Sequence, residues 1–354
     1  MKFSVPFIPD KAYIRFLTEK ISFLESVYFG LHSGPVLDSR IRFTQMDLSS
    51  LGKSLISMEG IKKYCLLNTR FIRPDLYTDT HFLNQLLDSL KFLHDKCHIN
   101  GIVVSDFYML NALDRTGHDM VPNLEAIPGI NCMMDSSQKI VSHMEMIENT
   151  RFMMPEKLVL DRSLNRDPEK LNNMILCIKS LYPHIKIELL ANEGCIYHCP
   201  FKPAHDAQIS LSNTGMVKEN THAVNRAAGC HAYFHQHPEK FFKSPFIRPE
   251  DVIHYQGVAD SLKLCGRTLG PGFLTRCITA YCKNDHDGNL LELMDATHFL
   301  ASFFHLDNRQ LGEGFFKKIT TCTKVCKNCS ICHDLFLNAV EKKSITLKPY
   351  GKDQ

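Results

Sequence analysis

The 354-residue sequence lacks the features that mark several large classes of protein. No apolar run approaches the roughly 18 residues that a helix needs to span a membrane. The first residues, MKFSVPFIPDKAYIRF, contain two prolines and early charges in place of an uninterrupted apolar stretch, so they do not read as a signal peptide. We therefore expect a cytoplasmic protein without a membrane span.

The sequence also lacks a dominant charge. Its 41 basic and 38 acidic residues leave a net charge of +3, and neither sign forms a block. This balance argues against tight non-specific binding to nucleic acid, although a local basic groove remains compatible with it. No internal repeat or low-complexity segment is present, and a hydrophobic content of 44% is enough to fill a sizeable core. The chain is long enough for one large barrel or two ordinary domains.

Short apolar runs separated by amphipathic stretches predict parallel strands with crossover helices. The eight runs are residues 2–7, 26–30, 64–68, 101–105, 124–130, 157–161, 185–191 and 261–265. Apolar positions recur at helical spacing in residues 80–97, 136–147 and 167–182. The last of these begins with Asp167 as the expected N-cap and Pro168 at the first helical position. Eight alternations favour an α/β fold of the (β/α)8 TIM-like barrel type over a doubly wound sheet.

We expect residues 1–310 to form this barrel and residues 311–354 to form a cysteine-rich C-terminal tail. The barrel would include a long insertion, residues 200–249, after the seventh strand. Barrel enzymes keep their catalytic groups at the C-terminal ends of the strands. The insertion would project from that face.

The fourteen cysteines are too many to be incidental. The length of the chain and the lack of an export signal argue against a disulfide scaffold, so metal binding is the leading explanation. Not all of them need this explanation, because several lie in apolar or amphipathic segments where cysteine is an ordinary core residue. These are Cys65, Cys97, Cys132, Cys177, Cys277 and Cys282.

Four other cysteines are predicted to meet at the barrel mouth. Cys195 and Cys199 follow the seventh strand, Cys230 lies in the insertion and Cys265 ends the eighth strand. Neighbouring strands lie about 4.8 Å apart, so Cys195 and Cys265 should emerge side by side, and the insertion can fold Cys230 over them. Four thiolates suit a [4Fe-4S] cluster or a structural zinc. The loose C-x3-C spacing favours the cluster.

The tail carries a second group of cysteines in the stretch CTKVCKNCSIC. Cys322, Cys326, Cys329 and Cys332 lie within eleven residues, and this tight spacing indicates a second iron-sulfur cluster or a zinc. The first three share the C-x3-C-x2-C spacing of radical S-adenosylmethionine enzymes. Those enzymes carry the motif near the start of their barrel, whereas only about twenty residues follow it here. That position argues against the radical assignment.

Polar residues that follow apolar strands are candidates for the active-site mouth. The candidate catalytic residues are Asp106, Asp161, Arg162, Glu193, Lys263 and Arg267. Lys263 lies two residues before Cys265 on a strand and should therefore share its face. Each strand-end residue could instead cap a helix or form a salt bridge. A role in proton transfer near the metal is plausible for the histidines of this region, which are His198, His205, His222, His231, His235 and His237.

Three segments resemble the peptidase U32 family, whose members are also called collagenase-like proteases. They are LDRSLNRD (160–167), IELLANEGCIYHCPF (187–201) and SPFIRPEDVIHYQGVADSLKLCGR (244–267). The resemblance extends from the second strand to the LKLCGR segment. Family members typically end this segment with a sequence like K-I-E-G-R, so Cys265 stands where a glutamate is usual. That departure supports Cys265 as a metal ligand.

Several branches of this family resemble oxygen-independent hydroxylases that carry a [4Fe-4S] cluster and act on tRNA, ribosomal RNA or the ubiquinone ring. By that similarity Cys195, Cys199, Cys230 and Cys265 would hold the cluster. The chain would then be an enzyme that performs hydroxylation or related redox chemistry on an RNA or small organic substrate. The tail cysteines are not part of the hydroxylase pattern.

Two alternatives remain open. One is a U32-type peptidase in which a metal only supports the structure, and the other is a non-catalytic subunit that needs a U32-like partner. The sequence offers proteolysis no independent support. No nucleophile with a base and no H-E-x-x-H motif can be recognised in it.

Overall fold

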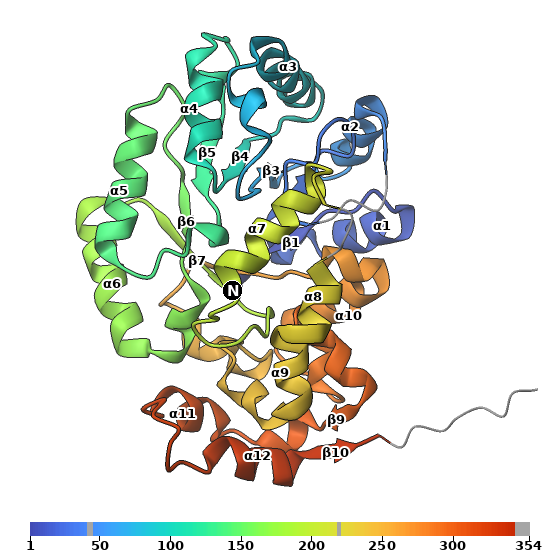
Figure 1. Cartoon of the computed structure of the whole chain (residues 1–354), viewed down its shortest axis with the longest axis vertical. Coiled ribbons are helices and arrows are strands. Elements are labelled where there is room, and N and C mark those ends of the chain that lie inside the picture. Colours follow the sequence, from blue (N-terminus) through green and yellow to red (C-terminus); the bar gives the residue numbers. More distant parts are fainter. Residues whose placement is uncertain (41–44, 218–220, 344–354) are drawn as a thin grey trace, which may run out of the picture.

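Eight parallel strands form one sheet that curls into a nearly closed barrel in the computed structural model (Figure 1). The structure describes residues 1–40, 45–217 and 221–343. The strand order is β5-β4-β3-β2-β1-β8-β7-β6. Between β5 and β6 the regular ladder is replaced by a bridge that joins Glu125 to Met153. The predicted (β/α)8 barrel is confirmed.

All eight predicted strands are present. They are β1 (Lys2–Pro6), β2 (Leu24–Gly30), β3 (Lys62–Leu67), β4 (Gly101–Val104), β5 (Glu125–Pro128), β6 (Lys157–Val159), β7 (Lys186–Leu190) and β8 (Ser261–Lys263). The pairing of β7 with β8 sets Leu190 opposite Lys263. The loops that carry Cys195 and Cys265 therefore leave the sheet from adjacent strands.

Helices surround the sheet and bury their apolar faces against it. They are α1 (Lys11–Glu19), α2 (Leu48–Ile56), α3 (Thr80–Cys97), α4 (Phe107–Arg115), α5 (Ser137–Glu148), α6 (Pro168–Leu181) and α10 (Gly270–Lys283). The three predicted helices correspond to α3, α5 and α6. At the start of α6 the Asp167 carboxylate accepts a hydrogen bond from the Lys170 amide at 3.1 Å, as the sequence predicts.

The cysteines predicted to be core residues divide into two groups. Cys65, Cys97, Cys132 and Cys277 are buried, which confirms the prediction for them. Cys177 and Cys282 are half-buried on the outer helices α6 and α10. The prediction was too strong for these two because each lies toward the edge of its helix's apolar face.

A charged pair lies inside the barrel. The Lys157 ammonium lies 2.8 Å from the Glu188 carboxylate and also donates to the hydroxyls of Ser4 and Ser26 at 2.9 Å. Ser261 donates to the same carboxylate at 3.1 Å, and Glu188 is completely buried. Burial by itself would raise the pKa of Glu188, but the charges of Lys157 and Lys263 outweigh it and hold this pKa below its ordinary value.

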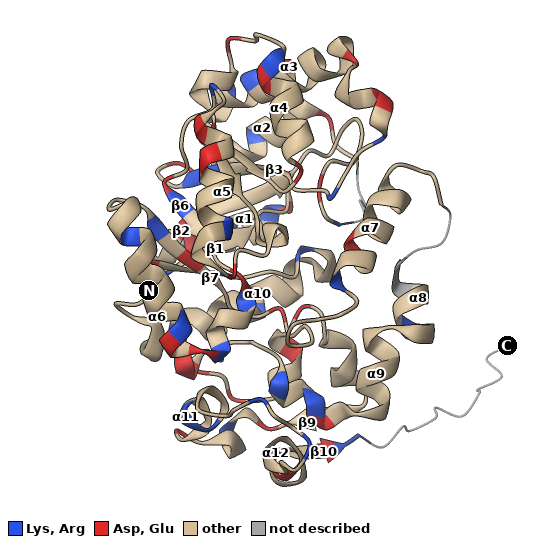
Figure 2. Cartoon of the chain, turned by 60° about the vertical axis from the view of Figure 1, so that its left-hand side comes forward, with Lys and Arg blue, Asp and Glu red and all other residues tan. Residues whose placement is uncertain are grey.

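The insertion after β7 is helical and lies against the C-terminal ends of the strands. It contains α7 (Lys202–Asn213), α8 (Thr221–Ala228), α9 (Cys230–Gln236) and the 3-10 helix η6 (Pro238–Lys243). Figure 2 shows α7, α8 and α9 following one another down the right-hand side of the molecule. The insertion therefore covers the face where the sequence predicts the site.

The chain after β8 adds a small second layer of structure. It includes β9 (Phe304–Leu306), α11 (Phe315–Thr320), α12 (Ile331–Ala339) and β10 (Val340–Lys342). β10 pairs antiparallel with β9. The predicted boundary between residues 310 and 311 thus falls between two strands of one sheet. The end of the predicted tail, residues 344–354, lies outside the described residues.

The distribution of charge agrees with the sequence. Figure 2 shows Lys and Arg residues interspersed with Asp and Glu residues over the barrel and the insertion. Within the described part of the chain, no helix has the length and apolar character to cross a membrane.

Candidate functional site

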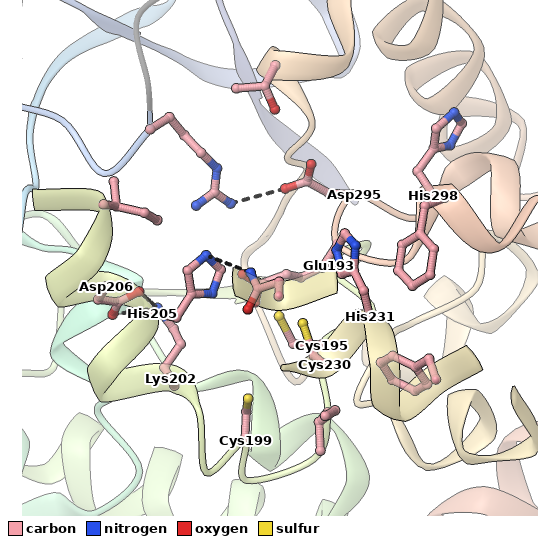
Figure 3. Close-up of a pocket in the computed structure, with 18 of the residues that line it drawn as sticks. Glu193, Cys195, Cys199, Lys202, His205, Asp206, Cys230, His231, Asp295 and His298 are labelled. Atoms are coloured by element: carbon pink, nitrogen blue, oxygen red, sulfur yellow. Dashed lines mark hydrogen bonds and ion pairs between the residues drawn. The ribbon is translucent and has the colours of Figure 1, made fainter. Parts of the chain in front are cut away.

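A cavity of about 300 Å³ lies between the barrel and the insertion, at the C-terminal ends of β7 and β8 (Figure 3). The loop after β7 forms one wall, α7 and α9 form a second, and residues 295–299 form a third. Ile196, Ile209, Phe234, Leu269 and Phe299 make much of the surface apolar. The cavity is where barrel enzymes bind their substrates.

Asn192 fixes the loops that form this site. Its side-chain amide donates to the carbonyl oxygens of Cys265 and Leu293 at 3.0 Å, and its oxygen accepts from the Cys265 amide at 2.7 Å. Two residues further on, Gly194 has φ +72°, and a Cβ there would collide with the side chain of Thr297. Glycine is therefore required for the loop to place Cys195 in the cavity.

Three of the four predicted barrel cysteines line this one cavity. Cys195 and Cys199 come from the loop after β7, and Cys230 comes from the first residue of α9. Figure 3 shows the sulfur atoms of Cys195 and Cys230 close together, with Cys199 on the same side. Burial raises the pKa of all three thiols, that of Cys230 to about 11. The structure thus places Cys195 and Cys230, which are 35 residues apart in the sequence, in one cavity.

The fourth cysteine of the set lies in an adjoining cavity. Cys265 lines a hollow of about 50 Å³, and Arg40, Glu193 and Asp295 line both spaces. The Cys265 thiol donates to the Asn192 side-chain oxygen at 3.3 Å. Among the described residues, no three His, Cys, Asp or Glu side chains are grouped to hold a single metal ion. A shared centre for all four cysteines therefore stays a prediction, with three of them in one cavity and the fourth next to it.

Charged side chains surround the thiols in pairs. Arg40 donates to Asp295 at 3.2 Å, and Arg162 forms an ion pair with Glu193. Lys202 lies 2.5 and 2.7 Å from the two oxygens of Asp206. Burial, with a further contribution from the charge of Arg162, lowers the pKa of Lys202 to about 8. Arg40 and Lys202 therefore line the cavity beside its thiols, each paired with a carboxylate.

Four of the candidate catalytic residues lie at the two cavities. Glu193 lines both of them, and Arg162 pairs with it. Lys263 and Arg267 line the smaller cavity together with Cys265, so Lys263 is on the side that its spacing predicts. The Lys263 ammonium lies 3.6 Å from the centre of the Tyr28 ring, and burial lowers its pKa to about 8. Arg267 pairs with Asp38 at 2.7 Å.

The other two candidates cap helices, which is the alternative that the sequence leaves open. The Asp106 carboxylate accepts from the amides of Tyr108 and Met109 at 3.0 and 3.3 Å, where α4 begins. It also accepts from the Tyr77 hydroxyl. Asp161 accepts from the Ser163 amide at 2.9 Å at the start of the 3-10 helix η5 (Arg162–Arg166). Neither residue lines the two cavities.

The geometry of Asp106 gives a direct test. Replacing Asp106 by alanine removes the cap of α4 and the acceptor of the Tyr77 hydroxyl. We expect the free energy of unfolding to fall by about 1–2 kcal/mol, measured by urea denaturation, with the metal content unchanged. Asp79, which caps α3 through the amides of His81 and Phe82, offers a matched control. If the Asp106→Ala protein instead lost bound metal while its stability stayed unchanged, Asp106 would have a role in the barrel site.

Several residues of the site were not predicted from the sequence. They are Arg40, Lys202, Asp206, Asp295 and His298. Lys202 and Asp206 did leave a signal, since a lysine and an aspartate four residues apart follow the thiol pair directly. Among the six predicted histidines, His205 and His231 line the cavity. The side chain of His222 lies outside what the structure describes.

The tail cysteines occupy a separate place. Cys322, Cys326, Cys329 and Cys332 line a cavity of about 220 Å³ together with Arg166, Lys240 and Lys243. This cavity lies between the tail, η5 and η6. The structure thus brings all four predicted tail residues to one space, apart from the barrel site.

Comparisons with known proteins agree with the resemblance seen in the sequence. No family model matches the chain. The chain is 28% identical over 270 residues to a protein of Methanocaldococcus jannaschii named uncharacterized protease MJ1657, and the match covers 74% of this chain and 71% of that protein. A solved structure titled as that of the U32 peptidase Mk0906 matches with a TM-score of 0.48 and 11% identity, over 74% of this chain and 92% of the other. The chain is thus similar to the archaeal protein over about three quarters of its length, and its LDRSLNRD, IELLANEGCIYHCPF and LKLCGR segments resemble the peptidase U32 family.

Proposed function

We propose that the chain is an iron-sulfur enzyme that carries out oxygen-independent hydroxylation, or related redox chemistry, on an RNA or small organic substrate. The observation that supports this most is that Cys195, Cys199 and Cys230 line one cavity at the barrel mouth. Cysteine thiolates are the ligands that iron-sulfur clusters use. The same cavity provides apolar walls and charged groups for a substrate.

The arrangement of the thiols fits a cluster better than a single ion. Four sulfurs around one zinc would lie only about 3.8 Å from one another, because each Zn–S bond is about 2.3 Å long. Among the described residues no such single-ion group is present, and Cys195, Cys199 and Cys230 line a cavity of about 300 Å³. A cube of four irons and four sulfides needs such a space. Cys195, Cys199 and Cys230 would hold it, and Cys265, across the border formed by Arg40 and Asp295, is the candidate fourth ligand.

The surrounding side chains would favour such a centre. A bound cluster would supply one-electron transfer, and one of its irons would be open to a further ligand only where three cysteines hold it. The charges of Arg162 and Lys202 act to lower the pKa of Cys195 and so oppose the effect of its burial. Phe234 and Phe299 add apolar surface to the cavity. His205 and His231 line the cavity and could hold or transfer a proton beside the substrate.

The proposed reaction has a definite balance. A C–H bond of the substrate becomes a C–OH group, so the substrate carbon is oxidised by two electrons. The oxygen atom comes from an oxygen-atom donor other than O2, and that donor loses the atom and is reduced by two electrons. The cavity would therefore admit two molecules, or two parts of one, during a catalytic cycle.

Peptide hydrolysis is the second candidate function. The printed name of the archaeal relative favours it. A nucleophilic cysteine needs a lowered pKa so that the thiolate is present at neutral pH. Burial instead raises the pKa of Cys195, Cys199 and Cys230. This direction argues against a thiolate nucleophile among them.

Metal and sulfide analysis of protein prepared without oxygen tests the proposal. We expect brown protein with about four iron atoms and four sulfides for each cluster, and an electron paramagnetic resonance signal after reduction. Incubation of the loaded protein with RNA or small aromatic substrates and an oxygen-atom donor, followed by mass spectrometry, should show a mass increase of one oxygen. Colourless protein that contains only zinc, or that cleaves peptides, would contradict the redox proposal.

A non-catalytic subunit is the third possibility from the sequence. In that case a U32-like partner chain should purify together with this protein and be needed for turnover. We expect instead that the single chain binds its cluster without a partner, because all four barrel cysteines lie on it.

A further inference from the structure

The tail cavity has the properties of a second, independent ligand site. Its four cysteines come from the short stretch before α12 and from the first turn of that helix. The opposite wall consists of groups from the barrel and the insertion, which are Arg166, Glu239, Lys240 and Lys243. Lys324 and His333 complete the lining. Four thiols thus face a wall that is mainly cationic.

The backbone of the tail is folded around its first thiol. Lys324 has φ +61°, in the left-handed region that residues other than glycine seldom occupy. This turn lets the Lys324 amide donate to the Cys322 sulfur at 3.3 Å. An amide that donates to sulfur stabilises the thiolate form, which is the form that binds metals.

Arg166 supplies an independent indication of a negatively charged ligand. This side chain is only 2% exposed, and its three hydrogen bonds go to the backbone carbonyls of Ile319, Phe242 and Ser244 at 3.2, 2.7 and 2.9 Å. No carboxylate compensates its charge in the described part of the chain, and the thiols Cys332 and Cys322 are the acidic groups that act on it most. A buried cation without a negative partner is costly.

We propose that Cys322, Cys326, Cys329 and Cys332 bind a [4Fe-4S] cluster that is separate from the barrel site and fastens the insertion to the tail. The cluster with its four thiolates carries a net negative charge, which would compensate Arg166, Lys240 and Lys243. The cavity of about 220 Å³ has room for a cluster, and four cysteine thiolates are the ligand set that a [4Fe-4S] cluster takes.

The proposed centre would support the barrel site through the insertion. Lys240 and Lys243 belong to η6, which follows α9 after a single residue, and α9 begins with Cys230. Phe242 of η6 packs edge-on against Phe315 of α11, with ring centres 6.2 Å apart. Arg166 connects η5, η6 and α11 through its three hydrogen bonds. Loading the tail site should therefore reduce the mobility of the segment that carries Cys230.

The test compares three forms of the full chain, prepared and reconstituted without oxygen. The Cys326→Ser/Cys329→Ser protein should lose about half of the iron, which is four of roughly eight atoms if both sites hold [4Fe-4S] clusters. The Cys195→Ser/Cys230→Ser protein should lose the other half and keep the tail signal in electron paramagnetic resonance. The Cys177→Ser protein alters a half-buried cysteine outside both sites and should match the wild type.

The outcomes separate this proposal from the proposed function. If the barrel holds no cluster, the Cys195→Ser/Cys230→Ser protein will keep all of the wild-type iron, while the tail variant will lose all of it. Zinc in place of iron at the tail, or a tail variant with unchanged iron, overturns the tail cluster. Hydrogen exchange of the Cys195→Ser/Cys230→Ser protein, which keeps only the tail site, tests the fastening before and after metal loading. After loading, we expect slower exchange in residues 230–243 and no change in residues 101–128. Equal exchange in residues 230–243 before and after loading would overturn the proposed fastening of the insertion.

Discussion

Anaerobically prepared protein in which serine replaces Cys195 is expected to lose the barrel cluster, about four iron atoms for each chain. The Cys195 sulfur lies in the same buried cavity as Cys199 and Cys230, and a serine hydroxyl is too weak an acid to replace a thiolate there. The product assay should fall to background because the redox centre is gone. Iron and sulfide analysis with electron paramagnetic resonance measures the loss.

Companion variants make this result specific. Cys230→Ser should give the same loss, although Cys230 belongs to the insertion and not to the loop after β7. Cys177→Ser should leave the iron content unchanged. The Cys265→Ser variant tests whether the cysteine in the adjoining cavity is the fourth ligand. Iron content should fall if Cys265 binds the cluster and stay unchanged if Cys265 only lies near it. A Cys195→Ser protein with an intact barrel signal would contradict the site.

The second large effect is expected on stability, inside the barrel. Replacing Lys157 by methionine leaves the Glu188 carboxylate completely buried without its ion-pair partner. Breaking a buried pair from one side costs about 3–5 kcal/mol, so we expect the free energy of unfolding to fall by that amount at neutral pH. Lys186→Met is the matched control, because Lys186 pairs with Glu25 at 2.8 Å on a more exposed part of the same sheet. That variant should cost less than about 1 kcal/mol.

The pH dependence of this effect has a definite sign. In the wild type the folded pKa of Glu188 is lowered, so its stabilising contribution is present above its ordinary pKa of 4.5 and is lost as the pH falls through the folded pKa. Without Lys157, burial would raise this pKa, and the folded state would favour the protonated carboxyl. The difference in the free energy of unfolding between wild type and Lys157→Met should therefore be small near about pH 4 and widen toward about pH 7. Urea denaturation across this pH range measures it.

A double variant distinguishes the charge effect from a packing effect. Lys157→Met combined with Glu188→Gln removes both charges and keeps an acceptor for Ser4 and Ser261. We expect it to recover more than half of the lost stability and to show no widening with pH. A double variant as unstable as Lys157→Met would mean that the lost packing of the lysine stem dominates.

The strands were predictable because each is a short apolar run, and such runs are buried on both faces of a barrel. The site was only partly predictable. Asp106 and Glu193 both follow an apolar strand, so the sequence pattern predicts the same role for both. In the structure a helix begins directly after Asp106, whose carboxylate caps it, whereas Gly194 turns the chain after Glu193 into an open loop. The role of a strand-end acid thus depends on the backbone that follows it.

Other parts of the site depend on contacts for which the sequence gives no local signal. Arg40 and Asp295 are 255 positions apart and pair only because the closed barrel brings the loops after β2 and α10 together. The insertion also packs over the barrel mouth through such long-range contacts. The sequence therefore predicts that Cys230 lies near the other thiols, but not its exact position. The smaller cavity around Cys265 was not expected, because spacing along a strand gives the face of a residue and not the width of the space beside it.

The thiols of the barrel site are divided between two segments of the chain. Cys195 and Cys199 belong to the loop after β7, whereas Cys230 begins α9 of the insertion. A centre bound by all three would act as an inorganic cross-link between these segments, and its binding energy would then contribute to the stability of the docked insertion.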